Sequence, residues 1–299
     1  MNSRLTLGIP MYNEEQWIGK TLVSVLDQSY SNFQVIVLDD ESHDKSCQIA
    51  SEFANRDDRI TLHRNRKNLG NLETFLKILK LANTELFGWV GAHDLLDRNY
   101  IRELIKELDD KPQISYAYGN LCFIDETGNL RGRDLEQIKT RVNSTKMENY
   151  LDMIGQCRKG GINFHGIYRR EILTNFEKTQ RKTLVGWDHV IVSRANFFGA
   201  SQVPSVNYLM RIFHARQSTT FTRLISNTSP ARDIKPSYIF LMVGYIRDFV
   251  SLPIAIQSKI LGSFKIIKKV THEYQFSFLK NLMLFIIFSL KSKCVWFKK

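Results

Sequence analysis

Cysteine is scarce in this sequence, and the few that occur form no recognisable pattern. The 299 residues contain four, none of them in a Cys-x-x-Cys pair: Cys47, Cys122, Cys157 and Cys294. This excludes a disulfide-stabilised scaffold, and we interpret all four as free thiols in a reducing compartment. No pair of histidines has the spacing of a zinc enzyme either.

Glycine-rich phosphate-binding motifs are also absent. The sequence has no Gly-x-Gly-x-x-Gly and no P-loop, which argues against a nicotinamide-dependent enzyme or an NTPase. No segment resembles an RNA-recognition or helix-turn-helix module, so we expect no nucleic-acid binding beyond what charge alone would give. The run Leu5–Ile9 indicates a strand with no charged or long apolar segment before it, so we expect no secretory signal.

What the chain does have is apolar content and an uneven positive charge. Its hydrophobic fraction of 43% and aromatic fraction of 11% exclude a disordered chain, and its length can bury one large core or two ordinary ones. From Gln257 onward, nine lysines against one acid, Glu273, supply +8 of the total charge of +12. A basic segment of this kind fits an anionic membrane, a nucleic acid or a solvated surface.

The first hundred residues predict alternating strands and helices. Apolar residues alternate between β-branched runs and helical spacing, which predicts a mostly parallel sheet covered by helices on both faces. The expected strands are residues 5–9, 33–38, 60–62 and 86–90, and the expected helices are residues 14–28, 44–54 and 72–81.

Polar and charged residues follow three of these strands. They are Tyr12-Asn13-Glu14, Asp39-Asp40 and His93-Asp94. Ligands of such sheets bind at the carboxyl ends of the strands, so these residues form a candidate site. The alternative is that Asp39 and Asp40 cap the next helix, a task that Ser42 and Asp44 could also perform.

The rest of the chain is less regular. Residues 114–124 predict one or two strands, and the polar, arginine-rich stretch 125–143 predicts a long loop. After about Arg223, long apolar stretches are broken by lysines, so we place a domain boundary there.

In its first part the sequence resembles the family 2 glycosyltransferases, which have the GT-A fold. Four motifs carry the resemblance in the family's order and spacing, strongly over residues 4–110 and weakly over 160–220. They are Gly8-Ile-Pro-Met-Tyr-Asn-Glu14, Phe33-Gln-Val-Ile-Val-Leu-Asp-Asp-Glu-Ser-His-Asp44, Asn68-Leu-Gly70 and Trp89-Val-Gly-Ala-His-Asp94.

The resemblance implies a role for each motif in binding a nucleotide-sugar. Pro10 and Tyr12 would flank the base and ribose, and Asp40, next to Asp39, would accept a hydrogen bond from the base. Asn13 and Glu14 would shape the loop, unless they serve as a helix cap. Asn68 and Gly70 would form the family's Asn-x-Gly turn.

The sequence departs from the family at the metal motif, which is normally Asp-x-Asp. Here Gly91-Ala92-His93-Asp94 lacks the first carboxylate and has His93 in place of the second. If a divalent cation binds, we expect Mn²⁺ rather than Mg²⁺, held by His93 or Asp94 and by the diphosphate. A metal-free site is the alternative. A second departure is Phe75, which stands where the family often has an arginine that faces the donor.

The weaker second region supplies the candidate catalytic base. The resemblance implies that Asp188, in Gly186-Trp-Asp-His-Val190, takes the proton of the acceptor hydroxyl; its alternative is an N-cap or ion-pair residue. The reaction would invert the anomeric carbon. His165 would line the donor sugar, and His214 and Arg216 would contact the diphosphate.

The C-terminal segment has an apolar run, Phe276–Leu290. As a helix it would be about 22 Å long, shorter than the roughly 30 Å of a bilayer core, and Lys280 interrupts it. The flanking lysines favour a helix lying in the membrane interface. The alternative is a helix packed on the domain or in a dimer interface.

Together these observations predict an α/β protein of the GT-A type with a C-terminal helical extension. Residues 1–110 would bind the nucleotide-sugar, 111–222 would bind the acceptor and catalyse, and 223–299 would form the basic extension. The expected activity is transfer of a sugar to a glycan or polyprenol-linked acceptor in cell-surface polysaccharide synthesis, in the cytoplasm at the inner face of the cell membrane. The alternative is a non-catalytic relative that binds a sugar-nucleotide or a glycan.

Overall fold

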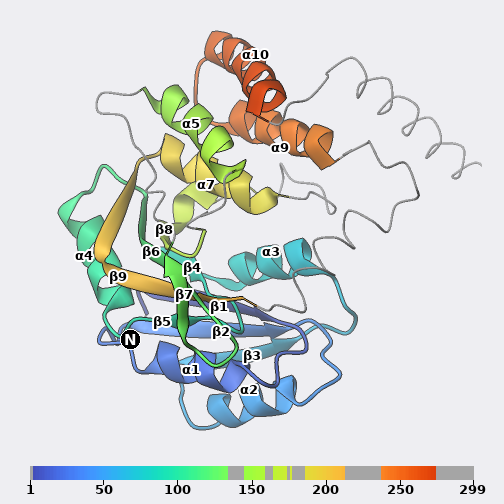
Figure 1. Ribbon diagram of the computed structural model, residues 1–299, viewed down its shortest axis with the longest axis vertical. Helices are drawn as coiled ribbons and strands as arrows, with labels where there is room; N and C mark the ends of the chain where they lie inside the picture. The colour runs from blue at the N-terminus through green and yellow to red at the C-terminus, as the bar shows by residue number, and fades with distance from the viewer. Residues whose placement is uncertain are drawn as a thin grey trace, which may run out of the picture.

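A central sheet with helices on both faces forms the body of the protein (Figure 1). The structure is a computed structural model and describes residues 3–133, 145–158, 164–173, 176, 186–212 and 237–273. The first part contains β1 (Leu5–Met11), α1 (Ile18–Leu26), β2 (Phe33–Asp39), α2 (Ser46–Ala54), β3 (Ile60–Arg64), α3 (Asn71–Leu81), β4 (Leu86–Trp89), β5 (Leu95–Leu96) and α4 (Tyr100–Asp110). The rest contains β6 (Tyr116–Ile124), β7 (Leu130–Arg133), α5 (Lys146–Arg158), β8 (Ile167–Arg169), the 3₁₀ helix η1 (Arg170–Leu173), α7 (Trp187–Phe197), β9 (Ala200–Arg211), α9 (Ser237–Ser251) and α10 (Ile256–Glu273).

The first four strands form the parallel part of the sheet, in the order β3-β2-β1-β4. This confirms the alternation predicted from the sequence, with one shift. The first helix begins at Ile18 rather than Glu14, and Asn13, with a positive φ of 54°, lies in the loop before it. The Glu14 carbonyl then accepts the backbone N–H groups of Trp17 and Ile18 and starts the helix.

The second half completes the sheet with mixed pairings. β8 pairs antiparallel with both β4 and β6, β6 pairs parallel with β9, and β5 pairs antiparallel with β9. The predicted long loop at 125–143 is wrong at its start, because Leu130–Arg133 pairs with β6 as strand β7. The turn between them is closed by Asp125, whose carboxylate accepts backbone N–H groups from Thr127 and Asn129.

Two apolar cores lie on opposite faces of the sheet. One packs α1, α2 and α4 against it, and the other packs α3, α5, α7, α9 and α10 (Figure 1). In the second core Arg194 of α7 and Asp248 of α9 form a fully buried ion pair at 2.9 Å. The Tyr150 hydroxyl of α5 donates to the same carboxylate at 3.2 Å, so one charge pair ties three helices together.

Among the described helices, none combines the length and apolarity needed to cross a bilayer. Of the cysteines, neither Cys47 nor Cys122 is in a disulfide, and the Cys122 thiol donates to Asn207 Oδ1 at 3.4 Å. The side chain of Cys157, Cys294, the run Phe276–Leu290 and the boundary near Arg223 lie outside the described residues.

Candidate functional site

The carboxyl ends of β1, β2 and β4 meet at a pocket of about 330 Å³. Its wall joins three of the sequence-predicted motifs to the start of α3 and to the turn after β4. The lining residues are Pro10, Met11, Tyr12, Glu14, Asp40, Asn68, Gly70, Asn71, Thr74, Phe75, Gly91, Ala92 and His93.

Asp40 organises the floor of this pocket. Its Oδ1 accepts the Asn65 side-chain N–H at 2.7 Å and the Leu69 backbone N–H at 2.8 Å, and its Oδ2 accepts the Gly70 N–H at 2.9 Å. Gly70 has φ +84°, a conformation that favours glycine, and directly precedes α3. A carboxylate has about four lone-pair sites, so three are used and one on Oδ2 remains for a ligand.

Asp39 does not line the pocket. Its side chain is fully buried, accepts the Ser42 backbone N–H at 3.1 Å, and forms an ion pair with Arg64 at 3.0 Å. Neither Asp39 nor Asp40 caps the following helix: its N-cap residue is Lys45, and Asp44, just before it, accepts the Ser46 N–H at 2.9 Å. The two neighbouring aspartates therefore have different tasks, one in the loop behind the site and one in the site.

The loop after β1 is held by side chains from the loop after β2. The Asn13 N–H donates to the Ser42 hydroxyl, and the Asn13 side-chain oxygen accepts the His43 N–H, both at 2.9 Å. This bracing stabilises the left-handed backbone at Asn13. Tyr12 stands at the rim with 44% of its surface exposed, so its ring is available to a ligand.

Glu14 and His93 face each other across the pocket. His93 Nδ1 lies 3.1 Å from Glu14 Oε1. An ionised carboxylate can only accept, so Nδ1 carries a proton and donates it to Glu14. His93 Nε2 is 3.8 Å from Asp94 Oδ1.

Asp94 is held from behind by β9. Its Oδ2 accepts the Tyr208 hydroxyl at 2.7 Å, and its Oδ1 accepts the Arg211 backbone N–H at 2.9 Å. Burial raises the pKa of Tyr208 well above its ordinary value, so the hydroxyl keeps the proton that it donates. A Cβ on Gly91 would lie 2.3 Å from Asp94 Oδ2, so a side chain at residue 91 would require the Asp94 carboxylate to move.

The chemistry of His93 and Asp94 fits a borderline ion such as Mn²⁺, which accepts both imidazole and carboxylate ligands. Their 3.8 Å separation can be bridged by one ion at metal–ligand distances of about 2.0–2.2 Å. Across the described ranges no group of three or more His, Cys, Asp or Glu side chains could hold a metal. An ion at this pair would therefore depend on further ligands from the diphosphate.

Two residues of the second half approach the same turn. The His165 ring stacks on Tyr208 with centroids 4.3 Å apart, and its Nδ1 lies 3.2 Å from the Trp89 carbonyl. Burial lowers the pKa of His165, while the nearby Asp94 and Asp188 charges act in the opposite direction. Asp188 lies in the first turn of α7 and is partly exposed. His214 and Arg216 lie outside the described residues.

Sequence reasoning missed both Tyr208 and Arg211 as site residues, and both lie on β9. Arg211 donates through Nε to the His93 carbonyl at 3.0 Å, and its guanidinium lies 4.3 Å from the Trp17 ring. No local pattern points to either residue, because both reach the motif only through the pairing of β9 with β5 and β6. Phe75, which departs from the family, contacts Trp89, Phe164 and Trp187 and closes the pocket's apolar wall.

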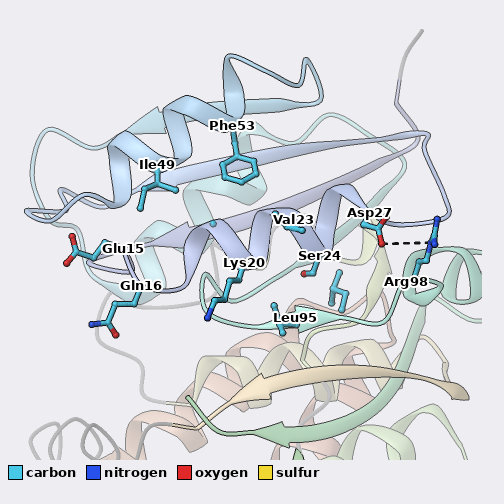
Figure 2. Close-up of a pocket in the computed structure, with 12 residues that line it drawn as sticks. Glu15, Gln16, Lys20, Val23, Ser24, Asp27, Ile49, Phe53, Leu95 and Arg98 are labelled. Carbon is cyan, nitrogen blue, oxygen red and sulfur yellow. Dashed lines mark ion pairs between the residues drawn. The ribbon is translucent and has the colours of Figure 1, made fainter. Parts of the chain in front are cut away.

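A larger groove of about 640 Å³ lies elsewhere, between α1, α2 and β5 (Figure 2). It is lined by aliphatic and aromatic side chains such as Val23, Ile49 and Phe53, with the Asp27–Arg98 pair at its margin. None of the sequence-predicted site residues lines it. Size alone therefore does not select the functional site.

Comparison with solved structures supports the fold. TarS of S. aureus in complex with UDP-GlcNAc matches with a TM-score of 0.66 and 15% identity over 90% of this chain and 73% of that one. The mannosyltransferase PcManGT of Pyrobaculum calidifontis, in complex with GDP-Man and Mn²⁺, matches with a TM-score of 0.52 and 16% identity over 98% of this chain and 81% of that one. The sheet and its helices thus have the GT-A arrangement.

Sequence comparison gives the family. The chain is 25% identical to the putative glycosyltransferase EpsH of Bacillus subtilis over 173 residues, which are 56% of this chain and 48% of EpsH. It is 32% identical over 117 residues to WfgD of Escherichia coli, named a UDP-Glc:alpha-D-GlcNAc-diphosphoundecaprenol beta-1,3-glucosyltransferase, covering 39% of this chain and 45% of WfgD. The chain thus spans about half the length of these relatives. The model of glycosyl transferase family 2 matches residues 6–176, which include most of β1, β2 to β8 and the four motifs that carry the resemblance, and the chain belongs to this family.

Proposed function

We propose that this protein transfers one sugar from a nucleotide-diphosphate-sugar to a hydroxyl of a glycan or lipid-linked acceptor, with inversion, in cell-surface polysaccharide synthesis. The observation that carries the proposal is the pocket at the ends of β1, β2 and β4, where Asp40 retains one acceptor site. Family membership and the donors named for TarS and PcManGT support the same class of ligand.

In this proposal the first half binds the nucleotide. The base donates an N–H to Asp40 Oδ2 and lies between Tyr12 and Pro10, all of which line the pocket. Asn13 and Glu14 shape the loop, and Asn68 and Gly70 form the facing turn. Asp39 contributes through the loop that it braces rather than by contact.

A divalent cation, Mn²⁺ before Mg²⁺, would be held by His93 and Asp94 and would supply positive charge for the leaving diphosphate. Glu14 holds the His93 ring through Nδ1, which orients Nε2 for that task. His214 and Arg216 are proposed as further partners of the diphosphate. His165 is proposed to line the sugar subsite beside Tyr208.

The second half supplies the base. Asp188 takes the proton of the acceptor hydroxyl as its oxygen attacks the anomeric carbon, and the nucleotide diphosphate leaves from the opposite side. Its place in the first turn of α7, partly exposed and close enough to influence the pKa of His165, supports this role.

We further propose an acceptor at the inner face of the cell membrane, supported by the diphosphoundecaprenol acceptor in the name of WfgD. The basic residues 274–299, with the apolar run Phe276–Leu290, would add a peripheral membrane contact. We propose no nucleic-acid partner.

A panel of nucleotide-sugars, each with and without Mn²⁺, tests the donor. A true donor binds the folded protein and so raises its melting temperature. At a donor concentration of 100 times the Kd, the free energy of unfolding increases by about 2.7 kcal/mol. We expect one base and one sugar to stand out, with a larger shift when Mn²⁺ is present. A panel in which every nucleotide-sugar leaves the melting temperature unchanged would contradict the proposal.

The second candidate is a sugar-nucleotide or glycan-binding protein without turnover. The altered Gly91-Ala92-His93-Asp94 turn favours it, because the family's first carboxylate is missing and Asp94 is buried behind the site. Donor stabilisation without product formation, measured with the identified donor and a set of lipid-linked acceptors, would select this candidate.

A further inference from the structure

The outward face of α10 exposes four large apolar side chains. Ile256, Ile260, Leu261 and Phe264 are 74%, 57%, 55% and 66% exposed. They recur at helical spacing and so lie along one side of the helix. The opposite side, with Ile266 and Val270 fully buried, packs into the core that α10 shares with α5 and α9, and α10 forms the outer edge of this helical layer (Figure 1).

Lysines border this apolar stripe, and acids are missing from it. Lys265 and Lys268 are exposed and Lys259 is partly exposed. Between residues 254 and 272 the sequence contains no Asp or Glu. Solvated surfaces usually mix both signs of charge, whereas an apolar stripe with a single-sign basic border is typical of helices that lie on anionic lipid.

Charge also decides between lipid and protein as the partner. Residues 274–299 carry five lysines and no acid, so folding them over α10 would bring positive charge against positive charge. A second copy pairing through the same face would do likewise, because a two-fold interface brings each patch against itself. An anionic bilayer satisfies both the lysines and the apolar stripe.

We propose that the outward face of α10 docks on an anionic lipid bilayer, with Ile260 and Phe264 inserted below the headgroups and Lys265 and Lys268 against the lipid phosphates. This contact is separate from residues 274–299. The docking rests on the proposed function in one respect, because a polyprenol-linked acceptor resides in such a bilayer. The docking itself needs no donor. The helix lies along the surface and does not span.

Sedimentation of the full chain with phosphatidylglycerol-containing vesicles tests the docking. The double variant Ile260→Gln/Phe264→Gln should lower the partition coefficient by about tenfold or more, because two inserted side chains are lost. Lys265→Gln and Lys268→Gln should each lower it by about fivefold at low salt. Val23→Gln, a matched exposed apolar residue on α1, should leave it unchanged.

A second measurement separates α10 from any other contact with the vesicle. Phe264→Trp places a reporter on the stripe, and brominated lipids should quench its added fluorescence, whereas Leu130→Trp should show no such quenching. No added quenching at residue 264 would overturn the proposal, even if the protein still sediments. The proposal would also be overturned if the double variant bound vesicles like the parent but had a lower melting temperature or a changed mass in ultracentrifugation. Those results would mean that the outward face of α10 packs against protein rather than lipid. Donor-induced stabilisation, measured on the same variants, reports separately on the proposed function.

Discussion

The two halves of the domain hold their site residues in different ways. In residues 1–110, which are proposed to bind the nucleotide and are here called the nucleotide half, side chains of neighbouring loops bond to backbone groups, as Asp40 does to Leu69 and Gly70 and Ser42 does to Asn13. In the other half, aromatic packing and the buried Arg194–Asp248 pair fix the helices. The first arrangement fixes the loop backbone through buried polar side chains such as Asp40 and Ser42, whereas the second makes a support whose buried charges are costly to disturb.

This difference predicts a division of labour. Changes in the nucleotide half should alter donor affinity, and changes in the second half should alter turnover or stability. Four substitutions test the division, beginning with the largest expected effect.

Asp188→Asn should reduce turnover by about 10²- to 10⁴-fold, because a general base contributes that much to the rate. Donor affinity should stay within about threefold, since Asp188 does not line the nucleotide pocket. Steady-state kinetics with calorimetric donor titration measures both. Turnover within a few-fold of the parent would show that Asp188 is not the base, and Glu171 or Asp152 would be tested next. A large loss of donor affinity would mean that the second half also binds the donor.

Asp248→Asn should destabilise the fold by about 3–5 kcal/mol, because Arg194 is left buried without its counter-charge. Asp109→Asn, in the exposed pair with Arg4, is the matched control and should cost about 0–1 kcal/mol. Urea unfolding followed by circular dichroism measures both. Equal effects of the two substitutions would mean that the buried pair gives the second half no special rigidity.

Asp40→Ala should weaken nucleotide binding by about 1.5–3 kcal/mol, the range for a hydrogen bond to a charged group. Because Asp40 also holds Leu69 and Gly70, Asn65→Ala serves as the control that perturbs the loop without removing the base contact. Calorimetry on folded variants should find the larger loss for Asp40→Ala. Unchanged affinity would refute the base contact.

The smallest expected effect is on the pH dependence of stability. Burial lowers the pKa of both His165 and His189, so below about pH 6.5 the unfolded chain takes up protons that the folded chain resists. The contribution of the two neutral histidines to the free energy of unfolding is therefore lost as the pH falls below about 6.5. Burial raises the pKa of Asp248 to about 6, so protonation of Asp248 adds stability as the pH falls and opposes the effect of the histidines. The contribution of His189 is therefore isolated by comparing the parent with His189→Gln. The variant should lose less stability between pH 7.5 and 5.5 in urea unfolding; parallel curves would exclude His189 as a contributor.

The same division explains what could be predicted from the sequence. Asp40 and Glu14 follow strands whose apolar runs are local signals, so their common edge could be expected, and the structure confirms it. Tyr208 reaches Asp94 from 114 residues further along the chain, and that contact depends on the pairing of β9 with β5 and β6. No local pattern contains such a register. Asp39 does not line the pocket for a simpler reason, because neighbouring residues in a strand point to opposite faces.

The closeness of Gly91 to Asp94 constrains how this sequence can change over evolutionary time. A single substitution that restores the missing carboxylate at residue 91 meets Asp94 Oδ2 at 2.3 Å, and that oxygen is already bonded to Tyr208. A side chain at residue 91 is therefore coupled to the position of the Asp94 carboxylate, which would have to move away from Gly91 and from its bond with Tyr208 to admit it.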